Sequence, residues 1–320
     1  MSRFAGVLLL SLAAAFSASA QDWPSKPVRF IVPFPPGGTV DPLARLVGVK
    51  LGDALKQQFV VENRPGAGGS IGTGIAAKSP PDGYTFVFVF DSHAVNPALL
   101  SNLPFDTARD FAPVMLVGRA PYAIATQSAK PWKSFAEAAS ASKAKPGSVS
   151  IGSIGNGTIG HLVLVLAQQM GGFQVTHAPY KGGGPMTQDI LGGQVEMGIG
   201  SAALLSPQVR AGKMRALAVT GEKRAPSLPD TPTLIEQGFP GLTAFAWWGI
   251  FAPAGTPKPV VDRFHGELVK AFGQADVKKT LTETLGMELV VSTPEALQKW
   301  NADEMAKWGK VVKENAIKVD

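Results

Sequence analysis

The chain of 320 residues contains no cysteine, and this absence removes several classes of function. Disulfides, thiol catalysis and cysteine-based metal sites are all excluded. The basic residues are scattered, and no run of five to eight lysines and arginines marks a nucleic-acid surface, although the formal net charge is +6. The four histidines are never three or four positions apart, so no helical metal pair is expected. We therefore predict no metal, no nucleic-acid partner and no cofactor.

Long apolar runs are also missing, except at the start of the chain. Arg3 precedes the apolar stretch FAGVLLLSLAAAFSA, and Ala18-Ser19-Ala20 forms a small-residue cleavage site before Gln21. This pattern is typical of a secretory signal peptide cleaved after Ala20, which predicts an exported protein. An uncleaved N-terminal anchor is the alternative, but the run is short for a membrane span.

About 300 residues remain, which favours two domains. Apolar, β-branched segments such as PVRFIVPF and YTFVFVF alternate with segments of helical periodicity such as PLARLVGVKLGDAL. This alternation predicts an α/β fold with parallel strands and helices on both sheet faces. Three helices are expected at the C-terminus.

Glycine-rich loops repeatedly join the end of a strand to the start of a helix. Residues 34–41, 90–97 and 152–161 are such junctions. A helix N-terminus carries unpaired N–H groups and a partial positive charge, so it attracts anions, and glycine lets them approach the backbone. Because ligands of open α/β sheets bind at the carboxyl ends of strands, we expect an anion site at these loops.

Two motifs suggest other functions. Gly155, Gly157 and Gly160 match the dinucleotide fingerprint G-x-G-x-x-G, but no Asp or Glu occurs from His161 to Gln188 to hold a ribose. Nucleotide binding is therefore disfavoured, whereas an anion at this helix start remains plausible on physical grounds.

The second motif is G-x-S-x-G around Ser70. A nucleophile elbow needs the serine on a sharp turn between strand and helix, and here RPGAGG separates the strand from Ser70. A secreted serine esterase is the rival hypothesis from a different class, and a carboxylate sensor for a membrane kinase is a third.

Several ordered segments resemble the tripartite tricarboxylate transporter substrate-binding (Bug, or TctC) family. They are WPSKPVRFIVPFPPGGTVDPLARLV, VVENRPGAGGSIGTGIAAKSPPDGYTF, NPALLSNLPFDTARDFAPV, GSIGNGTIGHL, YKGGGPMTQDILGGQVE and WGIFAPAGTPKPVVDRF. Together they span nearly the whole chain after residue 20.

The resemblance implies a non-enzymatic periplasmic binding protein with a two-domain, type II-like α/β fold and a cleft between the domains. Domain 1 would comprise residues 22–121 and 248–320, and domain 2 residues 122–247. Such a protein closes on an organic carboxylate and delivers it to the membrane permease of a tripartite tricarboxylate transporter. We expect a monomer.

The resemblance also implies which residues bind the ligand. Two loops would hold the carboxylate nearest the cleft floor through backbone groups, hydroxyls and ordered water. They comprise Pro36, Gly37, Gly38, Thr39 and Asp41 in the first loop, and Ser153, Gly155, Asn156, Gly157, Thr158 and His161 in the second.

Other residues are expected to set specificity or form the far wall: Asp91, Ser92, His93, Asp189, Gly200, Ser201 and Ala202. Several have structural alternatives. Asp41, Asp91 and Thr158 are common types of helix cap. His93 could be a buried core histidine, and Trp247 and Trp248 could stack on an aromatic acid or pack the segment that crosses between domains.

Overall fold

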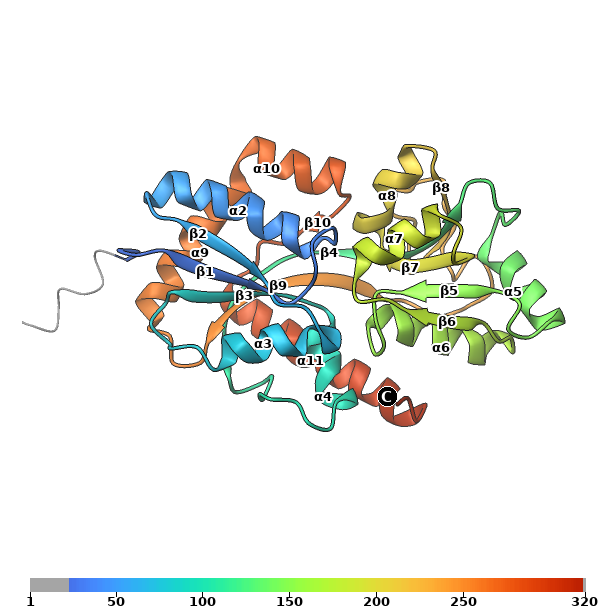
Figure 1. Ribbon diagram of the computed structural model, residues 1–320, viewed down its shortest axis with the longest axis horizontal. Coiled ribbons are helices and arrows are strands. Elements are labelled where there is room, and N and C mark those ends of the chain that lie inside the picture. The colour runs from blue at the N-terminus through green and yellow to red at the C-terminus, as the bar shows by residue number, and fades with distance from the viewer. Residues whose placement is uncertain (1–22, 319–320) are drawn as a thin grey trace, which may run out of the picture.

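The computed structural model describes residues 23–318, which form two lobes joined by a shared sheet (Figure 1). The strands are β1 (Val28–Val32), β2 (Phe59–Asn63), β3 (Thr85–Phe90), β4 (Phe111–Gln127), β5 (Ser150–Ser153), β6 (Thr176–Pro179), β7 (Met197–Ser201), β8 (Met214–Val219), β9 (Phe245–Pro253) and β10 (Glu288–Leu289). The helices are α2 (Val40–Leu55), α3 (Ser70–Ala77), α4 (Ser92–Leu99), α5 (Phe135–Ala144), α6 (Ile159–Gly171), α7 (Gly183–Leu191), α8 (Ala202–Arg210), α9 (Lys258–Gly273), α10 (Ala275–Lys279) and α11 (Pro294–Glu314). Short helical turns lie at Ala67–Gly69 and Thr280–Thr284.

The first lobe contains the strand order β2-β1-β3-β9-β4. β1 runs parallel to β2 and β3, whereas β9 is antiparallel to β3 and β4. Alternate residues of the strands point to opposite faces, so Phe30 packs with α2 and α9, and Ile31 with α3, α4 and α11. The predicted mixed α/β fold with helices on both sheet faces is confirmed.

The second lobe continues the same sheet in the order β4-β7-β5-β6, with β8 also paired to β4. β5 is parallel to β6 and β7. α5 and α6 contribute to the core on one face of these strands, and α7 and α8 to the core on the other.

β4 and β9 connect the lobes. The segments APVMLVG and YAIATQ are each strand-like in the sequence, but the structure joins them in β4, one strand of 17 residues. It pairs with β9 up to Pro121 and with β7 from Tyr122 onward, and register shifts in its first half let it bend. The predicted domain limits at 121/122 and 247/248 stay a prediction, although the change of partner in β4 coincides with the first of them.

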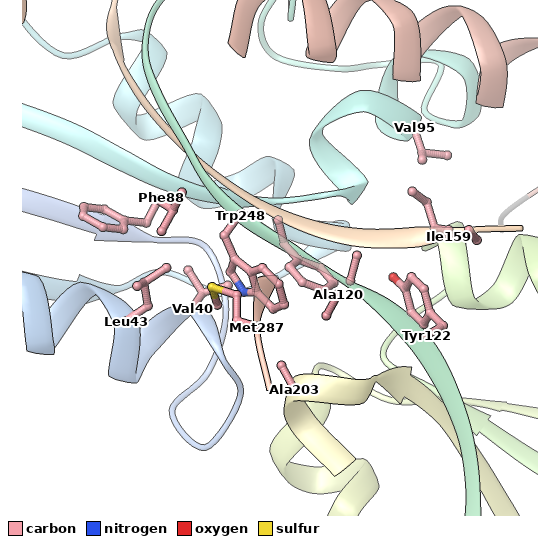
Figure 2. Close-up of a cluster of buried hydrophobic side chains, with 14 of the residues drawn as sticks. Val40, Leu43, Phe88, Val95, Ala120, Tyr122, Ile159, Ala203, Trp248 and Met287 are labelled. Carbon is pink, nitrogen blue, oxygen red and sulfur yellow. The ribbon is translucent and has the colours of Figure 1, made fainter. Parts of the chain in front are cut away.

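One buried hydrophobic cluster runs through the junction. Figure 2 shows Leu43 and Phe88 of the first lobe, Trp248 of β9, and Tyr122 and Ile159 toward the second lobe as parts of the same cluster. The hydrophobic core is therefore continuous across the junction between the lobes.

The predicted signal peptide and its cleavage site lie outside the described residues. Among the helices that are described, none is both long enough and apolar enough to cross a membrane.

Candidate functional site

A cleft lies where the two lobes face each other. Its wider part, the outer cavity, measures about 380 Å³. Its narrow part, the inner cavity, measures about 30 Å³. The two parts are neighbours, because Phe34 and Ile154 line both. A larger hollow of about 900 Å³ lies along α2 and β2, away from the second lobe.

The remaining lining residues come from both lobes. The outer cavity is lined by Pro33, Gly66, Ala67, Gly68, Gly69, Leu100, Gly155, Asn156, Pro179, Tyr180 and Lys181, and the inner cavity by Pro35, Gly38, Thr39, Val40, Phe90, Gly182, Gly183, Ser201 and Leu204. Among residues 23–318, Lys181 is the only charged residue lining either cavity, and no acid lines them.

The loop before α2 touches the second lobe directly. A Cβ added to Gly184 would lie 3.1 Å from the carbonyl oxygen of Pro36, and one added to Gly182 would lie 2.9 Å from Pro35 Cγ. Gly37 has φ of +88°, a conformation that glycine adopts without strain. The lobes are therefore closed on each other at this point, and bulkier residues would force them apart.

Thr39 joins this loop to the strand that crosses between the lobes. Its Oγ1 accepts a 2.9 Å hydrogen bond from Trp248 Nε1, and both residues are buried. The bond uses an acceptor position of the hydroxyl and leaves its proton available to a group in the inner cavity. Trp248 thus supports the loop, and neither Trp247 nor Trp248 lines the cleft.

The loop before α6 forms the opposite wall. Gly155 and Gly157 have φ of +148° and +73°, which explains the need for glycine there. Thr158 Oγ1 donates a 2.8 Å hydrogen bond to the carbonyl oxygen of Gly155, and Thr158 makes no side-chain cap bond. Asn156 and Gly155 line the outer cavity, whereas Thr158 lies buried behind the loop.

A pair of stacked histidines supports this loop from below. The rings of His161 and His177 are 4.2 Å apart with an interplanar angle of 3°. His161 Nδ1 accepts a 3.1 Å bond from the N–H of Gly157, and His177 Nε2 lies 2.7 Å from Ser153 Oγ. Burial lowers the pKa of His161, and burial together with His161 lowers that of His177 to about 4, so both rings are neutral near pH 7.

The predicted far wall lies partly at the cleft. Ser201 lines the inner cavity and caps α8, because its Oγ accepts a 3.2 Å bond from the N–H of Leu204. Gly200 and Ala202 are adjacent to it and do not line the cleft. Asp189 does not line the cleft, but it holds a residue that does: its Oδ2 accepts a 2.9 Å hydrogen bond from the hydroxyl of Tyr180, which lines the outer cavity. Burial and then Asp189 raise the pKa of Tyr180 to about 12.

The expectation that Asp41 caps α2 is wrong. Thr39 occupies the cap position, and Asp41 lies in the first helical turn. Its carboxylate is held by Arg45, at 2.9 Å, and by Asn63 Nδ2, also at 2.9 Å. An acid here stabilises the positive end of the helix, but it does not line either cavity.

Ser92 and His93 do not face the cleft. Ser92 Oγ donates a 2.7 Å bond to the carbonyl oxygen of Gly68, so it holds the 66–69 loop that lines the outer cavity. His93 is buried among Phe105, Phe111 and Phe251, and neither ring nitrogen has a partner among the described residues. Burial lowers its pKa to about 3, which agrees with the alternative of a core histidine.

Asp91 is likewise absent from the cleft lining. It is fully buried, and its Oδ2 accepts a 2.5 Å bond from the hydroxyl of Tyr122. Ser70, the rival nucleophile, begins α3 and makes no hydrogen bond to a histidine in the described part of the chain. The structure therefore brings no Ser–His pair together at Ser70.

The ligand residues predicted from the sequence did not include Phe34, Ile154, Tyr180 or the 66–69 loop, all of which line the cleft. Lys181, which also lines it, stands beside a glycine-rich loop and was weighed as a basic group that attracts the anion. Each of these residues adjoins a glycine-rich segment at the end of a strand, and such a segment indicates in the sequence which stretch of chain lines the cleft. The signal cannot show which individual side chain meets the other lobe.

The comparison with protein families agrees with this geometry. The model described as tripartite tricarboxylate transporter family receptor, TctC, matches residues 43–317. This chain belongs to the TctC family. The TctC relative BugT of Bordetella pertussis is 34% identical over 316 residues, which cover 98% of this chain and 97% of BugT.

Two solved structures similar to this TctC chain contain carboxylates. Rpa4515 of R. palustris, determined with adipate, has a TM-score of 0.88 and 35% identity, covering 92% of this chain and 99% of its own. MatC of Rhodopseudomonas palustris, with bound malate, has a TM-score of 0.85 and 31% identity, covering 91% and 100%. The family and these neighbours are solute-binding proteins.

Proposed function

We propose that this TctC protein is a periplasmic receptor that captures an organic carboxylate in the cleft between its lobes and delivers it to the permease of a tripartite tricarboxylate transporter. The observation that carries the proposal is the inner cavity, which the start of α2 and the cap of α8 line while no acid does. Similar proteins with adipate and malate support a carboxylate as the ligand.

Electrostatics favour an anion in this cleft. α2, α6 and α8 all begin at its edges, and helix N-termini present unpaired N–H groups and partial positive charge. Lys181 adds a full positive charge at the outer cavity. Since charge-assisted hydrogen bonds are roughly twice as strong as neutral ones, a carboxylate gains more here than an amide of the same shape.

The two cavities differ in size, and each suits a different part of the ligand. The inner cavity of about 30 Å³ has room for one or two groups the size of water, which suits one carboxylate. The body of the acid then extends into the outer cavity, against Phe34, Leu100, Ile154 and Tyr180. Apolar walls with few polar groups are typical of small-molecule sites.

The cellular role belongs to the same proposal. The N-terminal pattern favours export, and the family's description as a transporter receptor favours the permease as partner. Two lobes that close around a ligand offer the permease a surface that changes with occupancy. We propose that the protein acts as a monomer, with domains at 22–121 plus 248–320 and at 122–247.

The test is a thermal-shift screen followed by calorimetry on residues 21–320, using adipate, malate, benzoate and the corresponding amides. A ligand that binds only the folded state raises the melting temperature. We expect acids to raise it and amides not to. No shift with any acid would contradict the proposal.

A matched pair of variants tests the site within the same assay. In Gly184→Leu the new side chain meets Pro36 and Gly37 and prevents closure, so acid binding should be lost. In the control Gly266→Leu an added Cβ meets nothing within 4 Å, so binding should match the wild type. Equal binding by both variants would place the ligand elsewhere.

A further inference from the structure

Asp91 and Tyr122 form a buried pair behind the cleft, where the lobes join. Asp91 follows β3 and precedes α4 in the first lobe, while Tyr122 is the first residue of β4 to pair with β7 in the second. Both are fully buried, and the tyrosine hydroxyl donates to Asp91 Oδ2 at 2.5 Å.

The same tyrosine contacts the start of α6. A Cβ added to Gly160 would lie 3.0 Å from Tyr122 Cε1, so the helix backbone rests on the ring. The backbone N–H of Gly160 acts on the Tyr122 hydroxyl and lowers its pKa, although burial and Asp91 raise that pKa overall. Figure 2 shows Tyr122 beside Ile159 of α6, and Val95 of α4 belongs to the same cluster. One phenol ring therefore connects Asp91 to the helix that carries the 153–158 loop.

The surroundings of Asp91 favour the neutral carboxyl. Its Oδ1 is buried and has no hydrogen-bond partner among the described residues. From α11, Glu304 faces it and adds repulsion, while the Ser92 N–H and the Tyr122 hydroxyl favour the ionised form. Neither His93 nor any lysine or arginine of the described chain forms a hydrogen bond or ion pair with it. Burial dominates and raises the pKa of Asp91 well above its usual range.

We propose that Asp91 and Tyr122 are a positioning pair that seats the start of α6 against the first lobe when Asp91 is protonated, so that closing on the ligand takes up one proton. The proposal rests on the proposed function. When the lobes separate, α6 and β7 move with the second lobe, water reaches the pair, and Asp91 ionises.

The direction of the pH effect follows from linkage. The carboxyl binds its proton more tightly in the closed form, and the ligand selects that form. Affinity is then greatest at low pH and falls as pH rises between the open-form and closed-form pKa values of Asp91. Within that window the ligand affinity falls by up to tenfold for each pH unit, because binding takes up one proton.

The decisive experiment counts protons by calorimetry of adipate, malate and benzoate binding. Titrations at pH 7 in two buffers of different ionisation enthalpy give the number of protons taken up. Repeating the titrations at several pH values locates the window between the open-form and closed-form pKa values of Asp91. Within it we expect uptake approaching one proton per ligand in the wild type and in Glu304→Gln, and close to none in Asp91→Asn. The amide keeps the shape and an oxygen acceptor for Tyr122. His161 and His177 would contribute with the opposite sign, because burial keeps them neutral.

A second measurement covers the case in which Asp91→Asn does not fold. Infrared difference spectra of the wild type and Glu304→Gln should then gain the C=O band of a protonated carboxyl when the ligand is added. Ligand binding without proton uptake, or uptake that persists in Asp91→Asn, overturns the inference alone. Failure of all three acids to bind contradicts the proposed function and the inference together.

Discussion

Replacing Thr39 by valine tests whether the crossing strand supports the ligand loop. The substitution keeps the shape of the side chain and removes its hydroxyl. Trp248 Nε1, buried and bonded to Thr39 Oγ1 at 2.9 Å, then loses its acceptor. A buried donor left without a partner costs about 1–3 kcal/mol of unfolding free energy. In a chain of this length, each kcal/mol of unfolding free energy that is lost lowers the melting temperature by no more than about 4 °C.

The ligand should be affected separately from the fold. A hydrogen bond from the Thr39 hydroxyl to a carboxylate is worth roughly 1.5–3 kcal/mol, because one partner is charged. Its loss weakens binding roughly 10- to 150-fold. Thr39→Ser keeps the hydroxyl, so its affinity for the ligand should stay within about threefold of the wild-type affinity. A threefold change corresponds to less than about 1 kcal/mol of binding free energy.

Calorimetry with adipate and thermal melting of the free protein measure both effects on Thr39→Val and Thr39→Ser. If Thr39→Val binds adipate as tightly as the wild type, Thr39 does not touch the ligand. If its melting temperature is also unchanged, the Trp248 bond does not stabilise the loop.

Three further perturbations test parts of the same site. His93→Phe should raise the urea midpoint by removing two buried, unpartnered nitrogens worth about 1 kcal/mol, without changing adipate affinity. In that background, replacing His161 and His177 together by Phe isolates the stacked pair from Asp91. The urea midpoint of the parent should fall relative to that of the replacement as pH drops from about 6.5 toward 4, because the fold lowers the pKa of His161 and that of His177 to about 4 and so binds fewer protons there than the unfolded chain; a difference between the two midpoints that stays constant from pH 7 to 5 would contradict this. Gly160→Ala should cost about 1–3 kcal/mol by pressing on Tyr122 at 3.0 Å, and should weaken adipate binding, whereas a wild-type melt would show that the contact yields easily.

The sequence was informative wherever local chemistry decides the structure. Alternating periodicities predicted the α/β fold, and the glycine-rich junction predicted at 152–161 joins the end of β5 to the start of α6. The three C-terminal helices were also correctly placed, as α9, α10 with its following turn, and α11. These features depend on neighbours a few residues apart.

The errors concern contacts between distant segments. Asp91 follows a strand and was expected at the cleft, but Tyr122 of β4 covers it. His93 lies two residues further along α4, where a turn of about 200° directs it to the aromatic cluster. Asp41 was expected to cap α2, but Arg45 and Asn63 bind it instead. Nothing in the local sequence specifies these partners.

The place of β9 in the sheet has a consequence for how the chain assembles. β9 is inserted between β3 and β4, although more than a hundred residues separate it from either strand in sequence. During synthesis from the N-terminus, β3 and β4 are complete long before the strand that must lie between them exists. Strands β5 to β8 of the second lobe follow one another in the sequence, so all of them are synthesised before β9. The N-terminal lobe is thus the last to gain its central strand, and a chain that stops before residue 245 exposes two sheet edges that the complete protein covers.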